Sequence, residues 1–236
     1  MYQIIDLHIH AVPFIDDGAS DTEEAAEVLR LCEKQSVTDV FCTSHSGCLK
    51  DKSEAYFANF EKLKDLAEAL GIKVRLHRGC EVLFSAENIK ETLHYLETGV
   101  FSTLGESEYV LTELYPDLSL QEALYITEEQ KKHGYKPIIA HAERIYSLNS
   151  DMIFELIKNG ALIQVNAFNL VDDSDSERMK RARELLNKGY IHFIGSDGHN
   201  VNTRPPLLSE GVGFILDNAD KEYALEILNK NALRLL

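Results

Sequence analysis

The stretch Pro137-Ile138-Ile139-Ala140 is apolar at consecutive positions, and His141-Ala142-Glu143-Arg144 follows it directly. An apolar run without alternation is typical of a strand in a parallel sheet, because helices cover both faces of such a sheet. The stretch therefore predicts a buried parallel strand whose carboxyl end carries ionisable side chains.

Similar short runs alternate with longer amphipathic runs along the chain, and no linker rich in Pro, Gly or Ser interrupts them. The predicted strands are Gln3–Ala11, Asp39–Ser44, Lys73–Leu83, Tyr109–Leu114, Pro137–Ala142, Leu162–Ala167 and Ile191–Gly195. The predicted helices include Asp21–Gln35, Ser53–Leu70, Leu120–His133, Asp151–Lys158 and Ser176–Lys188. This many βα units in one α/β chain favour a barrel over an open sheet. A doubly wound sheet is the alternative, but the chain has neither G-x-G-x-x-G nor G-x-x-x-x-G-K, the phosphate-binding loops that usually accompany it.

The composition narrows the function classes. The chain has 24 Lys and Arg against 39 Asp and Glu, a formal charge of -15, which disfavours a nucleic acid partner. The segment from Met1 to His10 lacks a basic region and has a charge inside its apolar stretch, unlike a signal peptide. No apolar run approaches the roughly 18 residues of a membrane span, and the four cysteines form no C-x-x-C pair. We expect a cytoplasmic protein without membrane insertion.

The histidines are the most informative residues. Five of the nine lie at or just past the end of a predicted strand, where barrel enzymes keep their active sites: His8, His10, His45, His141 and His199. Four carboxylates are expected at the same level: Asp17, Glu81, Glu113 and Asp197. Each residue alone has an ordinary interpretation as a solvated, turn or core side chain, but potential ligands at six of seven strand ends are hard to attribute to chance.

The ligand types indicate which metals the site would bind. His8 and His10 are two apart on a strand, so both side chains point to one face and can share a cation. Nitrogen and oxygen ligands without a thiolate favour Mn, Fe, Zn or Mg used for hydrolysis. The number of ligands favours a cluster of two or three ions, an arrangement that clamps both the attacking and the leaving oxygen of a phosphoryl group.

Two arginines follow predicted ligands closely. Arg144 comes three residues after His141, and Arg204 comes five after His199 in Thr203-Arg204-Pro205-Pro206. The guanidinium fork matches phosphate oxygens. We favour phosphate binding for both arginines over the alternative, a salt bridge to a nearby carboxylate.

The motifs together resemble a known family. The set comprises Asp6-Leu7-His8-Ile9-His10, Asp16-Asp17-Gly18, Ser44-His45, Glu81, His141-Ala142-Glu143-Arg144, Gln164-Val165-Asn166, Ser196-Asp197-Gly198-His199-Asn200 and Arg204-Pro205-Pro206. It resembles the PHP (polymerase and histidinol phosphatase) superfamily and, more narrowly, is similar to the CpsB/CapC-type manganese-dependent tyrosine phosphatases of bacterial capsule and exopolysaccharide operons. The resemblance spans nearly the whole chain and implies one domain, 1–236, folded as a distorted (β/α)7 TIM-like barrel.

The resemblance also implies a site with three divalent ions, manganese above all. His8, His10, Glu81 and Asp197 would bind the first ion. Glu81 would bridge to a second ion held by Glu113 and His141, and Asp17, His45 and His199 would hold a third. Asp6 would orient a histidine ligand, as residues behind a metal site commonly do, and Arg144 and Arg204 match the phosphate-binding arginines. Glu113 is placed by strand register alone, with Glu106 and Glu108 close by.

The implied activity is removal of phosphate from a tyrosine-phosphorylated protein, with a bacterial tyrosine autokinase as the expected partner. Two other functions stay open: hydrolysis of a small phosphoester such as histidinol phosphate, and a metal-dependent binding module without turnover. Ser46-Gly47-Cys48-Leu49-Lys50 lacks the basic character that relatives often show there, so the preferred phosphopeptide is not implied. Cysteine-based phosphatase chemistry is excluded, because no cysteine has an arginine six positions on.

Overall fold

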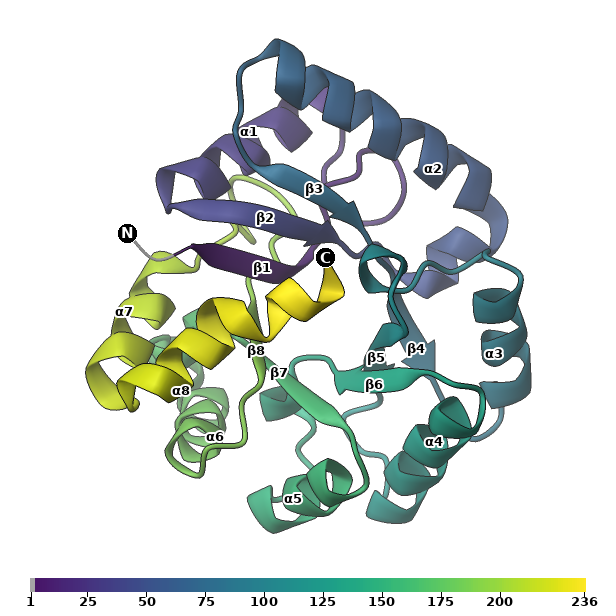
Figure 1. The fold of residues 1–236 in the computed structure, drawn as a ribbon, viewed down its shortest axis with the longest axis vertical. Helices are drawn as coiled ribbons and strands as arrows, with labels where there is room; N and C mark the ends of the chain where they lie inside the picture. The colour runs from purple at the N-terminus through teal and green to yellow at the C-terminus, as the bar shows by residue number, and fades with distance from the viewer. Residues whose placement is uncertain (1–2) are drawn as a thin grey trace.

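The computed structural model describes residues 3–236, and its strands all pair in parallel (Figure 1). The strands are β1 (Ile4–Ile9), β2 (Val37–Cys42), β3 (Arg75–Arg78), β4 (Glu81–Phe84), β5 (Tyr109–Leu114), β6 (Lys136–Ile139), β7 (Leu162–Asn166) and β8 (Phe193–Gly195). The α-helices are α1 (Thr22–Lys34), α2 (Ser46–Ala69), α3 (Ile89–Glu97), α4 (Leu120–Lys132), α5 (Ser150–Lys158), α6 (Ser176–Asn187), α7 (Ser209–Asn218) and α8 (Lys221–Leu225). The helices surround the strands, which confirms the predicted α/β architecture.

Hydrogen bonds just beyond the strand ends join the two sheets β1-β2-β3 and β4-β5-β6-β7-β8 into a ring. After β8, the Asp197 amide donates to the His8 carbonyl at 2.7 Å, and the His10 amide donates to the Gly198 carbonyl at 2.9 Å. After β2, the Ser44 carbonyl accepts from the Glu81 amide at 3.1 Å. All these hydrogen bonds lie at the carboxyl ends of the strands, the end at which the histidines were predicted to meet.

The predicted strand Lys73–Leu83 is wrong as a single strand. β3 ends at Arg78 and β4 begins at Glu81, with Gly79 and Cys80 between them. At Gly79 a Cβ would lie 2.9 Å from side chains of Leu104 and Thr43. The chain bends at this close approach, and the bend moves the strand from one sheet to the other.

Helix boundaries differ from the prediction in two ways. α2 begins at Ser46, seven residues before the predicted start at Ser53, and has non-helical backbone angles at Lys52. α3, α7 and α8 lie outside the predicted ranges. α7 contains Gly211, a poor helix former, but a Cβ there would lie 2.1 Å from the Ala167 carbonyl oxygen, so close packing requires the glycine.

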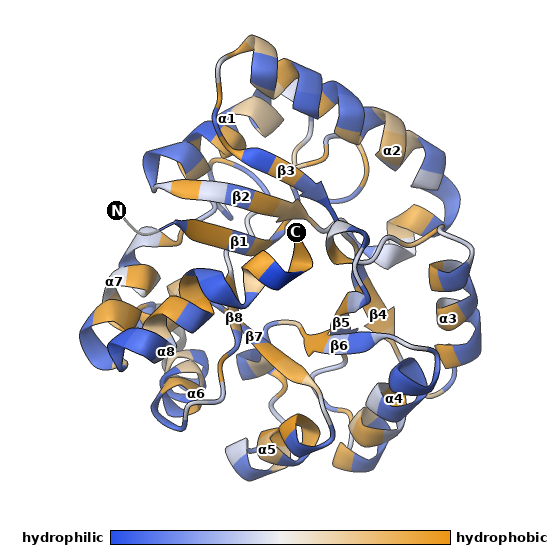
Figure 2. Ribbon diagram, viewed as in Figure 1, coloured by the Kyte–Doolittle hydropathy of each residue, from blue (hydrophilic) through white to orange (hydrophobic). Residues whose placement is uncertain are grey.

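Two hydrophobic cores support the ring. The outer core lies between strands and helices, and the apolar faces of the helices turn toward the strands in Figure 2. The inner core fills the ring with side chains from the strands and the residue after β6, from the 3₁₀ turn Leu104–Glu106 and from the C-terminal segment: Ile5, Leu7, Phe41, Leu104, Leu111, Ile138, Ala140, Phe193, Ala232 and Leu235. The C-terminal segment, a π-helical turn (Glu226–Lys230) and a 3₁₀ turn (Ala232–Leu235), crosses in front of the strands in Figure 1. It closes the end of the ring opposite the histidines.

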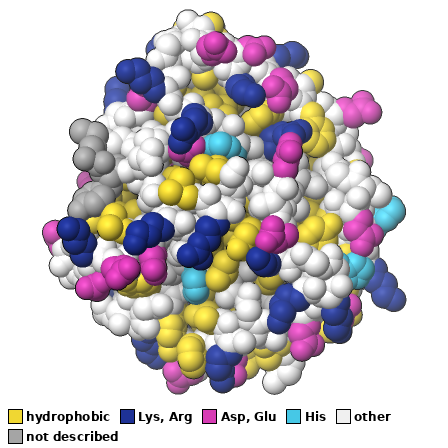
Figure 3. Space-filling view, viewed as in Figure 1, with side chains coloured by type: hydrophobic (Ala, Val, Ile, Leu, Met, Phe, Trp, Pro, Cys, Tyr) yellow, Lys and Arg dark blue, Asp and Glu magenta, His cyan; other side chains and the backbone are white. Residues whose placement is uncertain are grey.

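The face seen in Figure 3 carries basic and acidic side chains interspersed around apolar ones, without one large patch of either sign. Among the described residues, no helix combines the length and the hydropathy needed to cross a bilayer.

Candidate metal centre

An irregularity in β1 decides where its histidines point. Between Asp6 and Ile9, β1 advances by three residues while β2 advances by two. The extra residue is a β-bulge, which re-aims the side chains after it. In a regular strand Leu7 and Ile9 would lie on the same face. Here Leu7 packs in the inner core and Ile9 in the outer core, so the strand changes face between them. His8 and His10 consequently share the inner side, with their Nε2 atoms 3.1 Å apart.

Asp6 holds the bulge in place through the backbone. Its Oδ1 accepts from the His8 amide at 3.1 Å and from the Ser196 amide at 2.8 Å, and its Oδ2 accepts from the Ser196 hydroxyl at 2.6 Å. Burial raises the pKa of Asp6 to about 6 although these donors favour the charged form. Gly195 completes the support, because a Cβ there would lie 2.6 Å from the His8 Cβ. Asp6 therefore positions His8 through its amide.

Glu81 lies at the centre of the imidazoles. Its Oε1 is 2.7 Å from His141 Nε2, and its Oε2 lies 2.9, 3.3 and 3.4 Å from nitrogens of His45, His8 and His10. Despite these short separations, Oε2 makes no well-aligned hydrogen bond with any described residue, and His199 Nε2 is likewise buried without one. Buried polar atoms are rarely left unsatisfied. Converging lone pairs of this kind are what a cation requires.

Three histidines have their second ring nitrogen engaged away from the centre. His10 Nδ1 lies 2.9 Å from Asp16 Oδ2, and His199 Nδ1 lies 2.9 Å from the Asp197 carbonyl. His8 Nδ1 faces Gln164 Oε1 at 3.4 Å. A proton held on Nδ1 by such acceptors leaves Nε2 as the lone-pair donor, the arrangement typical of metal-ligating histidines.

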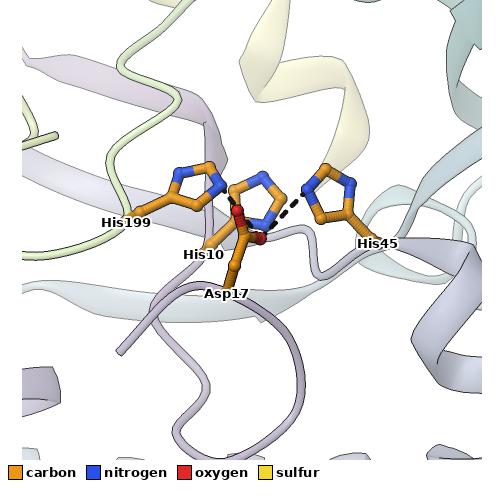
Figure 4. A group of neighbouring side chains, drawn as sticks. All are labelled: His10, Asp17, His45 and His199. Atoms are coloured by element: carbon orange, nitrogen blue, oxygen red, sulfur yellow. Dashed lines mark ion pairs between the residues drawn. The ribbon is translucent and has the colours of Figure 1, made fainter. Parts of the chain in front are cut away.

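A second group lies nearer the surface. His10, Asp17, His45 and His199 offer ligand atoms within 4.8 Å of one another, as Figure 4 shows. Asp17 Oδ1 is 3.3 Å from His45 Nε2 and 3.4 Å from His199 Nε2. The Asp17 side chain is 63% exposed, whereas those of His10 and His199 are buried. This group is thus open to solvent on the Asp17 side.

The structure brings together all nine residues predicted as ligands, in groupings that overlap at shared residues. Ligand atoms within 4.8 Å of one another come from His8, His10 and Asp197, from His8, Glu81 and His141, from His45, Glu81 and Glu113, and from the group drawn in Figure 4. Glu113 faces Glu81, as register predicted, but its group contains His45 in place of His141. His10 joins the group expected to hold Asp17, His45 and His199.

Two of these residues have left-handed backbones. His141 has φ 31° directly after β6, and Asp197 has φ 54° after β8. This conformation is uncommon outside glycine and is often found at functional sites. The Gln164 side chain holds His141 by accepting from its amide at 2.7 Å. Asp197 is held by the hydrogen bond that its amide donates to the His8 carbonyl.

Both predicted phosphate-binding arginines contact Asp197. Arg144 Nη1 lies 2.8 Å from Asp197 Oδ2, and Arg204 Nη2 lies 3.1 Å from Oδ1. Arg204 Nη1 is also 3.5 Å from Asp17 Oδ2. The alternative interpretation, a salt bridge to a nearby carboxylate, is therefore present in the structure. It does not exclude phosphate binding, because each guanidinium has further donors.

The close packing of these ionisable side chains shifts their pKa values. Burial opposes charge on His10, but Asp16 and Glu81 outweigh it and raise its pKa to about 9. His199 has the opposite balance: burial, His10 and Arg204 lower its pKa to about 4. Burial would raise the pKa of Glu81, yet the surrounding imidazoles hold it well below the usual value.

Asp16 supports the histidines but was not predicted from the sequence, from which only Asp17 of the Asp16-Asp17 pair was selected. Its Oδ2 contacts His10 Nδ1 and accepts from the His45 amide at 2.9 Å, and its Oδ1 accepts from the Gly18 amide at 3.1 Å. The Asp-x-Gly spacing was the available signal, since an aspartate often accepts from an amide two residues on.

The cysteines offer no competing nucleophile. Cys32, Cys42 and Cys80 are buried and Cys48 is partly buried, and burial raises the pKa of each thiol. A reactive cysteine requires the opposite shift.

The fold and the donor set together define a class: an α/β barrel with histidines, carboxylates and arginines gathered at the carboxyl ends of its strands, an arrangement fitted to bind metal ions and phosphate. Comparison with known proteins gives the family. Residues 4–236 match the family described as "Capsular polysaccharide synthesis, CpsB/CapC", and the chain belongs to it. The predicted resemblance is thereby confirmed.

Relatives in this family are phosphatases by name. The chain is 28% identical to tyrosine-protein phosphatase CpsB of Streptococcus agalactiae serotype III, over 99% of this chain and 98% of that protein. It is 30% identical to the putative tyrosine-protein phosphatase CapC of Staphylococcus aureus, over 88% and 81%. For tyrosine-protein phosphatase YwqE of Bacillus subtilis the identity is 27%, over 99% and 91%.

Solved structures confirm the fold. One reported among "YwqE from Bacillus subtilis and CpsB from Streptococcus pneumoniae, unique metal-dependent tyrosine phosphatases" superposes with a TM-score of 0.87 at 24% identity, covering 98% of this chain and 94% of the other. An organophosphorus hydrolase variant from Deinococcus radiodurans gives 0.63 at 14% identity, over 98% and 92%.

Proposed function

We propose that the protein is a metal-dependent phosphomonoesterase that removes phosphate from phosphotyrosine in a protein substrate. The observation that carries the proposal is the pairing of a buried His/carboxylate cluster with two arginines at one carboxylate, Asp197. The naming of the family's relatives as tyrosine-protein phosphatases supports the same substrate.

We infer that the cluster binds three divalent ions, manganese first among Mn, Fe, Zn and Mg, through nine residues: His8, His10, Asp17, His45, Glu81, Glu113, His141, Asp197 and His199. Nitrogen and oxygen donors fit these metals. When bound, such ions supply Lewis-acid polarisation of phosphoryl oxygens and an activated water. Asp6, Asp16 and Gln164 would fix the backbone and the tautomers of the histidines.

Arg144 and Arg204 would bind the nonbridging phosphate oxygens. Divalent ions at Asp197 and Asp17 would take over the neutralisation that the arginines now provide, which leaves guanidinium donors for the substrate. In the transition state the charge of the phosphoryl group is spread over its three equatorial oxygens, where these contacts would stabilise it. A tyrosine leaving group, with a pKa near 10, departs more readily than an alkoxide and has less need of a general acid.

The experiment that tests the proposal is phosphate release from a tyrosine-phosphorylated peptide by metal-stripped protein, before and after manganese is restored. We expect release only after manganese addition, and we expect iodoacetamide to leave it unaffected because no thiol takes part in the reaction. Inactivation by iodoacetamide at full metal occupancy would contradict the mechanism.

Two parallel assays separate the alternatives. Release from histidinol phosphate but not from the phosphopeptide would indicate a small-molecule phosphoesterase. Tight phosphopeptide binding without release would indicate a binding module. We propose a bacterial tyrosine autokinase of capsule or exopolysaccharide synthesis as the physiological substrate, and a cytoplasmic location in keeping with four free cysteines.

A further inference from the structure

A cavity of about 510 Å³ adjoins the arginines. Arg144, Asp197 and Arg204 line one part of it, and Phe168, Pro205 and Leu207 supply apolar lining. A volume of this size is within the range of small-ligand sites. The remaining lining is polar: Asn166, Asn169, Asp172, Arg178, Ser196 and Thr203. The cavity therefore combines charged and polar groups with an apolar part that contains Phe168.

Phe168 is the one aromatic residue among those that line this cavity. It lies in the 3₁₀ turn Ala167–Leu170 directly after β7 and is half-buried. It belongs to neither hydrophobic core, and its ring stacks on no aromatic or cationic partner among the described residues. Covering the exposed part of an apolar ring is favourable, so a ligand in the cavity would gain free energy by packing against Phe168.

The turn that carries Phe168 is fixed on both sides. Buried Glu143 accepts from the Asn166 amide at 3.1 Å and from Asn169 Nδ2 at 2.6 Å. The Phe168 carbonyl accepts from the amides of Val171 and Asp172 at 3.0 and 2.9 Å. The ring is thus presented on a prearranged backbone, which lowers the entropic cost of binding a ligand.

The distance from this turn to the phosphate-binding groups is short. Asn166 Nδ2, two residues before Phe168, donates to Asp197 Oδ2 at 3.0 Å, the oxygen that Arg144 also contacts. Phe168 and both arginines line the same cavity, so a phosphate held by the arginines would have its ester substituent in the space that Phe168 lines. An aryl substituent has the size and the apolar surface to contact the Phe168 ring there, whereas a short alkyl group has less surface to offer.

We propose that Phe168 is the specificity-determining residue that receives the aryl group of the substrate and makes the site prefer aryl over alkyl phosphates. This inference rests on the proposed phosphatase function and adds a residue and a substrate preference to it.

The kinetic experiment compares the manganese-loaded protein with Phe168→Ala and Phe168→Leu on a phosphotyrosine peptide and a phosphoserine peptide of otherwise equal sequence. Loss of an aromatic contact predicts a fall in kcat/KM of about 3- to 10-fold for phosphotyrosine in Phe168→Ala. Phosphoserine hydrolysis should change less than about twofold, and Phe168→Leu should lie between. Tyr125→Ala, which removes an exposed aromatic of α4 outside the cavity, is the matched control and should leave both rates unchanged.

A binding experiment needs no turnover. The chain contains no tryptophan, so Phe168→Trp introduces a single fluorophore into the cavity and Tyr125→Trp a control outside it. We expect phenylphosphonate to change the Phe168→Trp emission at about 3- to 10-fold lower concentration than methylphosphonate. Tyr125→Trp should respond to neither compound.

The outcomes separate this inference from the proposed function. Equal affinity for the two phosphonates, or an equal fall for both peptides in Phe168→Ala, would overturn the role of Phe168 while leaving the phosphatase function intact. A phenylphosphonate preference without release from any phosphoester would support the aryl site and contradict the phosphatase function.

Discussion

Asp39 and Asp197 are both buried aspartates of the barrel, and both lie beside arginine and histidine, but at different levels. Asp39 lies in the first half of β2, toward the end closed by the C-terminal segment, whereas Asp197 follows β8 at the carboxyl ends. The same residue types therefore occur at two levels of one ring, and their contacts differ.

Around Asp39 every contact is a short, direct hydrogen bond. Arg75 donates from Nε and Nη2 at 2.8 and 2.7 Å, His77 Nε2 lies at 2.8 Å, and Thr38 donates from its hydroxyl at 2.8 Å. Burial would raise the pKa of Asp39, but these donors hold it well below the usual value. Its oxygens are saturated, and the group needs no ligand.

Around Asp197 the histidines lie further away. His8 and His10 Nε2 are each 3.6 Å from Oδ1, and His199 Nδ1 is 3.7 Å away, too far for hydrogen bonds. Among the described residues, only the arginines and Asn166 make close contacts with its carboxylate oxygens. Charge alone thus does not mark a binding site. At Asp197, unlike Asp39, three histidine nitrogens converge on one carboxylate oxygen without hydrogen-bonding to it.

The largest expected effect comes from replacing the carboxylate of Asp197 or of Asp39 by an amide. Asp197→Asn should lower kcat/KM roughly 100-fold or more, since removing a ligand should exceed the 10- to 100-fold effects typical of residues behind a metal site. Asp39→Asn should leave kcat/KM of the folded enzyme unchanged and lower the free energy of unfolding by about 1–3 kcal/mol. Phosphopeptide kinetics and denaturant titration measure the two effects. Comparable activity losses in the two variants would contradict the distinction.

The arginines give a smaller contrast. Arg204→Ala should lower kcat/KM by about 10- to 100-fold, the value of a charged hydrogen bond, while metal content stays that of the wild type. Arg75→Ala should retain activity and lower Tm, because Asp39 loses two donors. Inductively coupled plasma measurements of bound manganese accompany the kinetics. Wild-type turnover in Arg204→Ala would show that the arginine has no role in catalysis.

The smallest effect concerns pH. A folded-state pKa below the unfolded value of about 3.9 means that Asp39 stabilises the fold above that value, and that this contribution disappears as the pH falls through the folded pKa. The difference in unfolding free energy between the metal-free wild type and Asp39→Asn should therefore stay constant above about pH 5 and narrow as the pH falls below about 4. Chemical denaturation at each pH measures it, and a gap independent of pH would argue against a charged Asp39.

Much of the fold and site was accessible from sequence because it depends on local patterns. Apolar runs such as Pro137–Ala140 mark parallel strands, and residues after such strands meet at one end of a barrel, so His141 and Asp197 could be placed from their position alone. Glu113 was placed by strand alternation, and it faces Glu81 as expected.

The remainder depended on tertiary contacts. The bulge at His8 is specified by Asp6 together with Ser196, which is 190 residues away in sequence. The break at Gly79 arises from packing against Leu104 and Thr43, and α7 tolerates Gly211 because Ala167 leaves no room for a side chain. Asp16 was missed because its contacts to His10 and His45 come from loop geometry, which spacing does not reveal.

The C-terminal segment has a consequence for synthesis of the chain. Ala232 and Leu235 are part of the inner core, and the Leu235 carbonyl lies where a Cβ on Gly105 would be 2.4 Å away. Because translation proceeds from the amino terminus, these residues are the last of the barrel to leave the ribosome. Until then the strands can pair, but the interior stays open to water at one end. The barrel therefore completes its inner core only after Leu235 has left the ribosome, and a nascent chain stalled before residue 226 should bind hydrophobic dyes that the folded barrel excludes.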